Sequence, residues 1–408
     1  MNGKRRAEYP HPRASAGAAL LIMLLAMTLA FSAFLIASLA ESDPDAERRQ
    51  RTFETLMQAK QALIAWAVVR GDFGADSHHR PGTLPCPDTK FFGDTESGNA
   101  SGSCSIGGGT SLGRLPWKSL GMDRLRDAHG EMLWYAVSDS FRNPELAKAA
   151  INSDTKGTLL LYAADGSTLL TPAGEELSAV IFAPGPPLPG QDREALPDAA
   201  SSYLDAFDGK NNAKAGGPFI AGPAKDSGGN RVVNDLIVGI TARELLSGLE
   251  KRALNEAGKA LKKYADDNGR YPNPAPFDAP GCTSSIGDVK SAVTPCAGDG
   301  VTPTCLGRFP EDLAASGLAP WFSQNGWGRV MIYAIHDSGA GCATFLNVDG
   351  KPEKYVLFAP GAARAGQHRP STALPDYLED AANTDGWSGD PNFSAPGASS
   401  NDQLRAEP

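Results

Sequence analysis

The sequence lacks an excess of basic residues. Its 408 residues include 38 Lys and Arg against 47 Asp and Glu, which gives a formal net charge of -9. A nucleic-acid-binding surface needs a basic face that neutralises phosphates, and here Lys and Arg cluster only at the extreme N-terminus. We therefore expect no nucleic-acid partner.

Motifs of catalysis are also lacking. The chain contains no G-x-S-x-G motif, and Gly107–Gly109 lacks the Lys and Ser or Thr of a phosphate-binding loop. His78 and His79 have no Cys or Glu at metal-binding spacing. No nucleophile is accompanied by a base, so the sequence predicts a protein that is not an enzyme.

Long hydrophobic runs are rare, and the single long one decides the class of protein. Residues 18–40 carry no charge, and at about 1.5 Å per residue they span a hydrocarbon core of roughly 30 Å. Basic residues precede this segment and acidic residues follow it. The positive-inside rule therefore predicts a single-pass protein with a cytoplasmic N-terminus and residues 41–408 outside.

Two other interpretations of this segment stay open. A cleaved secretory signal peptide has a shorter apolar core and a small-residue cleavage site, which Ser38–Ala40 matches only weakly. A plain uncleaved signal anchor fits the same residues.

The residues before the apolar segment favour a more specific interpretation. A basic leader ends in Gly17, and the apolar run begins at once with Ala18. This junction resembles the prepilin-peptidase site of type IV pilins and type II secretion pseudopilins. The resemblance implies cleavage between Gly17 and Ala18, methylation of the new N-terminus, and an inner-membrane protein whose partners are prepilin peptidase and other pilin-like subunits.

One position departs from the usual pilin pattern. Most pilin-like subunits carry Glu at the fifth mature position, where this chain has Ile22. The missing Glu resembles the large minor pseudopilin and some minor pilins. The resemblance therefore implies a minor subunit at or near a filament tip.

Beyond the apolar segment, the chain predicts an amphipathic helix from Glu47 to Val69. Its apolar residues recur at spacings of three, four and seven, as expected for one buried face, and they are Phe53, Leu56, Met57, Leu63, Ile64, Ala67 and Val68. Pro44 is predicted to bend or break the helix between the two segments. Two separate helices fit the sequence almost as well.

The remainder of the chain is an internal duplication. Five sequence blocks recur in one order, beginning at Gln61 and Lys259, Gly113 and Gly307, Leu133 and Met331, Val180 and Val356, and Gly190 and Gly366. Each copy predicts a helix, a loop rich in Gly and Pro, and three short strands. The strands are expected at residues 132–137, 158–163 and 179–182 in the first copy and at 330–335, 344–348 and 354–358 in the second. Asp-Gly turns after the middle strands predict that the second and third strands pair as a hairpin.

The second copy carries a sharper resemblance. Ala260–Pro272 is similar to the helix end and turn of major pseudopilins, with Asn268-Gly269 as a left-handed helix stop. Trp327–Tyr333 and Tyr355–Gly361 resemble two of their strands. The predicted fold is α+β: a leader (1–17), a transmembrane helix (18–40), two tandem pseudopilin-like heads (41–250 and 251–385) and a disordered tail (386–408).

The exported region contains two kinds of candidate site. An even number of exported cysteines indicates disulfides, and the duplication favours the pairs Cys86–Cys104, Cys282–Cys305 and Cys296–Cys342, with Cys296–Cys305 as an open alternative. Major pseudopilins hold calcium, and hard oxygen ligands on flexible loops suit Ca²⁺. The candidates here are Asp88, Asp94 and Glu96 in one loop, and a second acidic loop contains Asp376, Glu379, Asp380 and Asp385.

These observations predict a minor pilin-like structural subunit of a type IV pilus or type II secretion filament, with its heads in the periplasm. A membrane-anchored binding or adhesion protein is the alternative. Its ligand surface would use the tryptophans Trp117, Trp321, Trp327 and Trp387.

Overall fold

The computed structural model describes residues 44–70, 80–91, 93–102, 104, 111–142, 150–194, 199–277, 305–336, 346–385 and 391–408. The chain divides into two compact units, residues 1–51 and 52–408. No helix within the described ranges has the length and apolarity that a membrane crossing requires. The predicted transmembrane segment 18–40 and the processing site Gly17-Ala18 lie outside those ranges.

The predicted amphipathic helix is present as α2 (Pro44–Val69). Pro44 is its first described residue, and proline suits the first turn because the N–H that it lacks would have no partner there. Leu56, Leu63 and Ala67 are fully buried, but Phe53, which was predicted on the buried face, is 49% exposed. The buried face also carries Lys60, whose ammonium donates to Gly239 O (2.9 Å).

Each copy of the duplication builds one four-stranded antiparallel sheet with the same strand order. In the first copy the order is β1 (Ser111–Arg114), β2 (Trp134–Val137), β4 (Leu177–Ala183) and β10 (Leu236–Thr241). In the second copy it is β11 (Leu306–Arg308), β12 (Ile332–Ile335), β15 (Tyr355–Ala359) and β17 (Gln403–Glu407). The α+β class predicted from the sequence is confirmed.

The predicted hairpins form only in part. In both copies the first predicted strand pairs with the third, as β2 with β4 and β12 with β15. The turn at Asp349-Gly350 does form, but it joins β13 (Leu346–Val348) to the short strand β14 (Lys351–Glu353). In the first copy, β3 (Leu161–Tyr162) pairs in parallel with β7 (Phe219–Ile220). In the first copy Leu159 keeps an antiparallel bridge with Leu177 of β4. The apolar side chains of the middle strands pack in the outer clusters, and they are Leu159, Leu161, Leu346 and Val348.

The described part of the chain also contains several small elements. The 3-10 helices are η1 (Ala200–Ser202), η2 (Ala314–Ser316), η3 (Trp327–Arg329) and η4 (Leu374–Asp376). The short α-helices are α4 (Pro320–Gln324) and α5 (Ala381–Thr384). The remaining strands are β5 (Ala206–Phe207), β6 (Lys210–Asn211), β8 (Ala224–Lys225), β9 (Arg231–Val233) and β16 (Asn392–Phe393).

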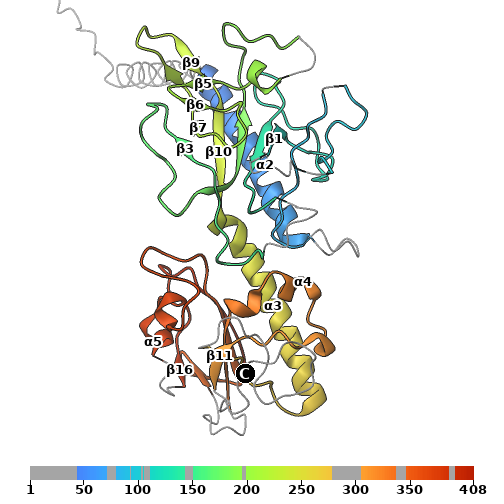
Figure 1. Cartoon of the computed structure of the whole chain (residues 1–408), viewed down its shortest axis with the longest axis vertical. Coiled ribbons are helices and arrows are strands. Elements are labelled where there is room, and N and C mark those ends of the chain that lie inside the picture. The colour runs from blue at the N-terminus through green and yellow to red at the C-terminus, as the bar shows by residue number, and fades with distance from the viewer. Residues whose placement is uncertain are drawn as a thin grey trace, which may run out of the picture. The chain divides into compact units, whose positions relative to one another are not determined.

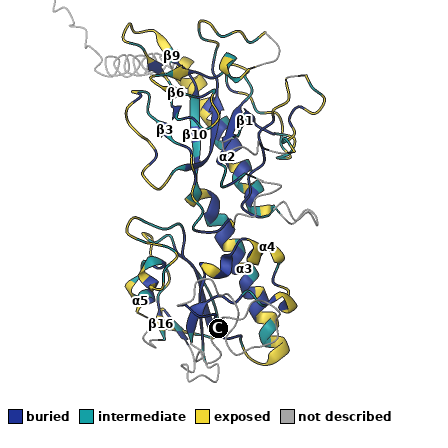
Figure 2. Cartoon of the chain, in the orientation of Figure 1, coloured by how far each residue is buried: buried dark blue, intermediate teal, exposed yellow. Residues whose placement is uncertain are grey.

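The central strands of both main sheets are buried on both faces. Alternate residues of β2 and β4 point into different clusters: Tyr135 and Ile181 join a large core, and Trp134 and Phe182 join an outer cluster beneath the covering loops. The strands β12 and β15 alternate in the same way. This double burial explains why these four strands are continuous apolar runs. Figure 2 shows the contrast with α3 (Ala242–Asn268), along which dark blue buried residues alternate with yellow exposed ones.

A single helix, α3 (Ala242–Asn268), serves both copies. It begins with a capping box between Thr241 and Glu244 and ends at Gly269, whose φ of 72° is left-handed. The predicted stop at Asn268-Gly269 is confirmed. Figure 1 shows α3 continuing from the end of β10 into the second copy.

The helix α3 also joins the cores of the two copies. One continuous cluster contains α2, α3 and the inner faces of both sheets. The boundary predicted between residues 250 and 251 therefore falls in the middle of a buried helix.

The end of the chain differs from the predicted disordered tail. Residues Asn392–Phe393 form β16, which pairs in parallel with β13, and Gln403–Glu407 form β17, which pairs with β15 along five residues. The strand β17 takes the place that β10 holds in the first sheet. Its backbone hydrogen bonds order a segment whose polar composition indicates disorder.

Candidate functional site: a repeated arginine and tyrosine network

One predicted disulfide is confirmed. Cys86 and Cys104 are bonded, with a Cα–Cα distance of 5.5 Å. Cys305 is disulfide-bonded as well. The other three cysteines lie outside the described residues, and these are Cys282, Cys296 and Cys342.

The two copies do not place their cysteines equivalently. In the first copy Asp88 pairs with Arg114, and in the second Ala275 pairs with Arg308 in the same antiparallel geometry. Cys86 lies two residues before Asp88, and Asn273 lies two residues before Ala275. Asn273 therefore holds the place of Cys86 in the second copy. No cysteine holds the place of Cys86 in the second copy, and the pairing of Cys282 with Cys305 stays a prediction.

The candidate calcium residues are engaged within their own loop. The buried carboxylate of Asp88 accepts hydrogen bonds from the backbone N–H groups of Lys90 (2.9 Å) and Gly98 (2.6 Å). The side chain of Glu96 pairs with the Lys90 ammonium (3.2 Å), and Asp94 accepts from the N–H of Glu96 (2.8 Å). Within the described ranges, no three His, Cys, Asp or Glu residues lie close enough to share a metal ion.

The strongest feature shared by the copies starts on the first strand of each sheet. Gly113 and Gly307 lie against a neighbouring backbone, where an added Cβ would come within 2.4 Å of Asp88 O and 2.2 Å of Ala275 O respectively. Only glycine allows this approach. The contact fixes the next residue, an arginine in both copies.

These arginines are buried beside a tyrosine. The guanidinium of Arg114 lies 5.6 Å from the ring centroid of Tyr203, and that of Arg308 lies 5.0 Å from the ring of Tyr377. The Nη2 of Arg308 also donates to Ser371 O (2.7 Å) and to the Tyr377 hydroxyl (3.1 Å). Stacking and hydrogen bonds together compensate the burial of the cation.

A second arginine lies over the same tyrosine ring in each copy. Arg193 is 5.1 Å from the Tyr203 centroid, and Arg369 is 5.0 Å from that of Tyr377. Both belong to the repeated Gly-Gln-x-Arg block, and both donate to the carbonyl of the glycine that ends the Ala-Pro-Gly block at 2.8 Å, Gly185 O and Gly361 O. Each tyrosine thus contacts two arginines that are distant in sequence.

A pair of acidic residues completes the network. In the first copy the Asp235 carboxylate accepts from the N–H of Asp205 (2.8 Å), and the Asp205 carboxylate accepts from the N–H of Asn234 (2.7 Å). The same reciprocal contacts recur in the second copy, both at 3.1 Å, among Glu379, Asn401 and Asp402.

Three carboxyl groups of these pairs, those of Asp205, Asp235 and Asp402, have raised pKa values. Burial raises the pKa of Asp205, and it raises that of Asp235 well above its ordinary value, with repulsion from Asp205 as a further cause. Burial, with repulsion from Glu379, raises the pKa of Asp402 to about 7.

Sequence reasoning found only part of this network. The glycine, arginine and tyrosine positions belong to blocks that were recognised as repeats. The Asn-Asp pair at residues 234–235 and 401–402 was missed. A match of two residues is too short to be recognised as a repeat, and the strands that follow the pairs differ in sequence. The shared strand positions of β10 and β17 reveal the match.

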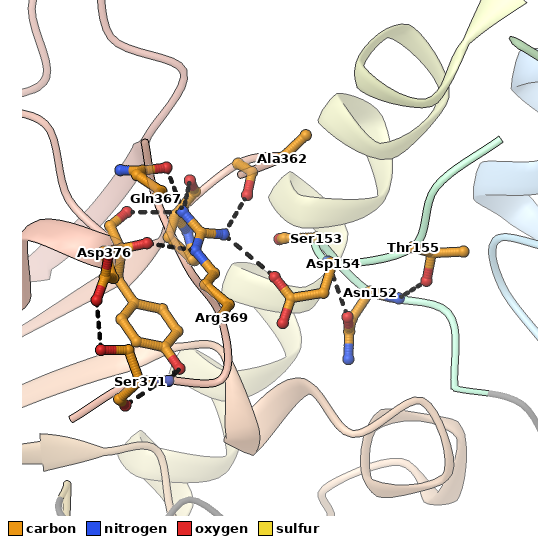
Figure 3. A network of polar contacts seen from close by, with 12 residues as sticks. Asn152, Ser153, Asp154, Thr155, Ala362, Gln367, Arg369, Ser371 and Asp376 are labelled. Carbon is orange, nitrogen blue, oxygen red and sulfur yellow. Dashed lines mark hydrogen bonds and ion pairs between the residues drawn. The ribbon is translucent and has the colours of Figure 1, made fainter. Parts of the chain in front are cut away.

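The second arginine pairs differently in the two copies. Arg193 pairs with Glu131 of its own copy (2.8 Å), whereas Arg369 pairs with Asp154 of the other copy (3.3 Å). Figure 3 shows Arg369 between the carbonyls and side chains of its own loop and the Asp154 carboxylate on the loop of residues 152–155. The duplicated arginine has thus become a contact between the copies.

Further polar contacts join the copies at the same place. The side-chain amide of Asn152 donates to Asn325 O (2.9 Å), and the amide of Asn325 donates to Pro81 O (2.9 Å). The guanidinium of Arg80 donates to Gln324 O (2.8 Å). Together with the ion pair of Arg369 and Asp154, these contacts join residues 80–81 and 152–154 of the first copy to residues 324–325 and 369 of the second.

The candidate ligand-binding tryptophans are dispersed. Trp327 is fully buried in the core, and Trp117 and Trp321 are partly buried beside cations. Trp387 lies outside the described residues. No protein-family model, curated protein or solved structure matches the chain.

The tyrosine hydroxyls allow a matched test of the network. Tyr377→Phe removes the partner of Arg308 Nη2 and of the Ser371 N–H, so we expect the free energy of unfolding to fall by about 1–3 kcal/mol. Tyr203→Phe removes a long contact to Arg193 O (3.5 Å) and a hydrogen bond with the Arg114 side chain, and it should cost less than Tyr377→Phe, which also leaves a backbone N–H without its acceptor. Urea unfolding of both variants checks the order, and equal losses would contradict it.

Proposed function

We propose that this chain is a minor pilin-like subunit, anchored by residues 18–40 in the bacterial inner membrane, that carries a double head at or near a filament tip. The observation that carries the proposal is the junction at Gly17 and Ala18, where a basic leader meets an uncharged apolar run. Ile22 in place of the usual Glu favours a minor subunit.

The architecture is compatible with this role. An N-terminal helix that packs on an antiparallel sheet is the plan that the resemblance implies, and from Thr52 onward α2 buries one face in the core of the first sheet. A second sheet of the same strand order makes the head larger, and so large a head would clash with neighbouring subunits along the side of a filament. A tip position accommodates both heads.

The processing site tests the proposal. The mature protein should begin at Ala18, and a Gly17→Ala variant should keep residues 1–17 and run as a longer chain. Intact-mass measurement of the membrane-extracted protein checks both results. Gly3→Ala changes a leader glycine away from the junction and should be processed normally. An intact N-terminus in the wild type, or cleavage near Glu41, would refute the proposal.

A further inference from the structure

A carboxylate lies buried where the two copies meet. Glu250 is in the middle of α3 and is only 2% exposed. Its Oε1 accepts from the Ser153 hydroxyl of the first copy (2.9 Å), and its Oε2 accepts from the Gln403 amide of the last strand (2.8 Å). One side chain on the shared helix therefore holds a loop of one copy and the edge strand of the other.

The two direct partners of this carboxylate are uncharged. The nearby cation is Arg369, and its guanidinium forms an ion pair with Asp154, the neighbour of Ser153 in sequence. Asp402 precedes Gln403, and it accepts from the N–H of Glu379. The charge that acts on Glu250 is that of Arg369, and Asp154, Asp402 and Glu379 are the ionisable groups linked to its neighbours.

A buried carboxylate with neutral partners is costly as an anion and stable as an acid. The Ser153 hydroxyl can donate to the anion and can equally accept from the protonated Oε1. The Gln403 amide donates to Oε2 in either state. The site is therefore built to hold Glu250 in both states, and the low polarity around it favours the neutral one.

We propose that Glu250 is a proton-binding latch, which takes up one proton from solvent as the medium becomes weakly acidic and then holds the two copies together more tightly. The latch is independent of the proposed function, because it rests on contacts within residues 52–408 alone. Its consequence is a double head that stiffens in acid and loosens in alkali.

The sign of the pH dependence follows from the burial of Glu250. Burial raises its pKa from the ordinary value of 4.5 to about 7, and hydrogen bonds from Ser153 and Gln403 oppose the rise. The folded chain therefore binds a proton more readily than the unfolded chain does. The stabilisation is complete below the unfolded pKa and is lost as the pH rises through about 7.

The experiment compares the full chain in detergent micelles at pH 5.5 and pH 8, with urea unfolding followed by tryptophan fluorescence. For Glu250 alone we expect the folding equilibrium constant to be about 30-fold larger at pH 5.5. Glu250→Gln mimics the protonated state, so it should raise the pH 8 midpoint and remove this share of the pH dependence. Glu256→Gln, on the same helix with a partly exposed side chain, should keep the wild-type profile.

Two further measurements make the test decisive. Asp402→Asn removes a second carboxyl group whose pKa is raised to about 7. This variant should keep the part of the pH dependence that comes from Glu250. If Glu250→Gln does not fold, Ser153→Ala should move the midpoint of the pH profile to higher pH, because the anion loses a donor. Parallel wild-type and Glu250→Gln profiles, a Glu250→Gln chain less stable than wild type at pH 8, or an unmoved Ser153→Ala profile would overturn the proposal.

Discussion

A chain cut after Glu250 should lose its fold. The cut divides α3, and one continuous core contains the inner faces of both sheets packed against this helix. A fragment that ends at residue 250 would expose Leu245, Leu246 and Leu249, which are fully buried in the intact chain. Full burial of one such side chain stabilises by about 1.5–3 kcal/mol, so exposure of the three leucines would cost about 5–9 kcal/mol, which is comparable to the net stability of a typical domain.

The test places a protease site after Glu250 and, in a matched variant, after Gly228. Residues 228–229 form an exposed turn between β8 and β9, where a cut breaks no buried contact. After digestion, near-ultraviolet circular dichroism should be lost only in the first variant. Two stable fragments that unfold separately would show instead that the copies are independent domains.

The sequence predicted the elements better than their pairing. Repeated blocks located α2, α3 and the paired strands of both sheets, because buried apolar runs and the Asn268-Gly269 stop are local signals. The strand pairing is not local. The Asp349-Gly350 turn fixes a reversal of the chain, but core packing decides that β12 pairs with β15.

The strand β17 shows why the end of the chain was misjudged. Leu404 and Ala406 pack on the outer cluster, so only alternate residues of this strand are apolar. On the inner face Gln403 and Arg405 occupy the places of Leu236 and Val238 in β10, as the pairing with β15 and β4 shows. A five-residue strand with polar inner positions gives no signal above its Gly-rich and Ser-rich surroundings.

The polar inner positions have partners that only the fold supplies. The amide of Gln403 donates to Glu250 and to Ser247 O (2.9 Å), and the guanidinium of Arg405 donates to Asn255 (2.7 Å). Arg405 lies over Gly258, where an added Cβ would come within 2.2 Å of its Nε. The second sheet thus meets α3 through hydrogen bonds at places where the first uses apolar packing.

Only part of the arginine network could be predicted from the sequence, because its contacts also depend on the fold. Its arginines and tyrosines lie in recognised blocks, but nothing in their spacing reveals that two arginines share one ring. Nor does the sequence distinguish Arg193, which pairs within its copy, from Arg369, which pairs with Asp154 of the other. The second contact depends on the geometry around α3.

A single methyl group added at Gly307 should have a large effect on stability. In Gly307→Ala the new Cβ would lie 2.2 Å from Ala275 O and 2.8 Å from the Pro274 side chain. The clash is with backbone that is itself fixed, since Ala275 and Arg308 exchange two backbone hydrogen bonds of 2.9 Å. Relief requires these bonds to break and Arg308 to move from Tyr377, so we expect a loss of about 2–4 kcal/mol in the free energy of unfolding.

The duplication supplies an internal replicate and the chain supplies a control. Gly113→Ala meets Asp88 O at 2.4 Å and should lose a similar amount, whereas Gly397→Ala lies in open space with ordinary backbone and should stay within about 0.5 kcal/mol of wild type. Urea unfolding of the three variants measures these changes. If Gly307→Ala and Gly397→Ala unfold alike, the backbone can yield at this strand, and the glycine does not hold the buried arginine in place. If only Gly113→Ala matches the control, the close approach matters in the second copy alone, where the arginine network also joins the two sheets.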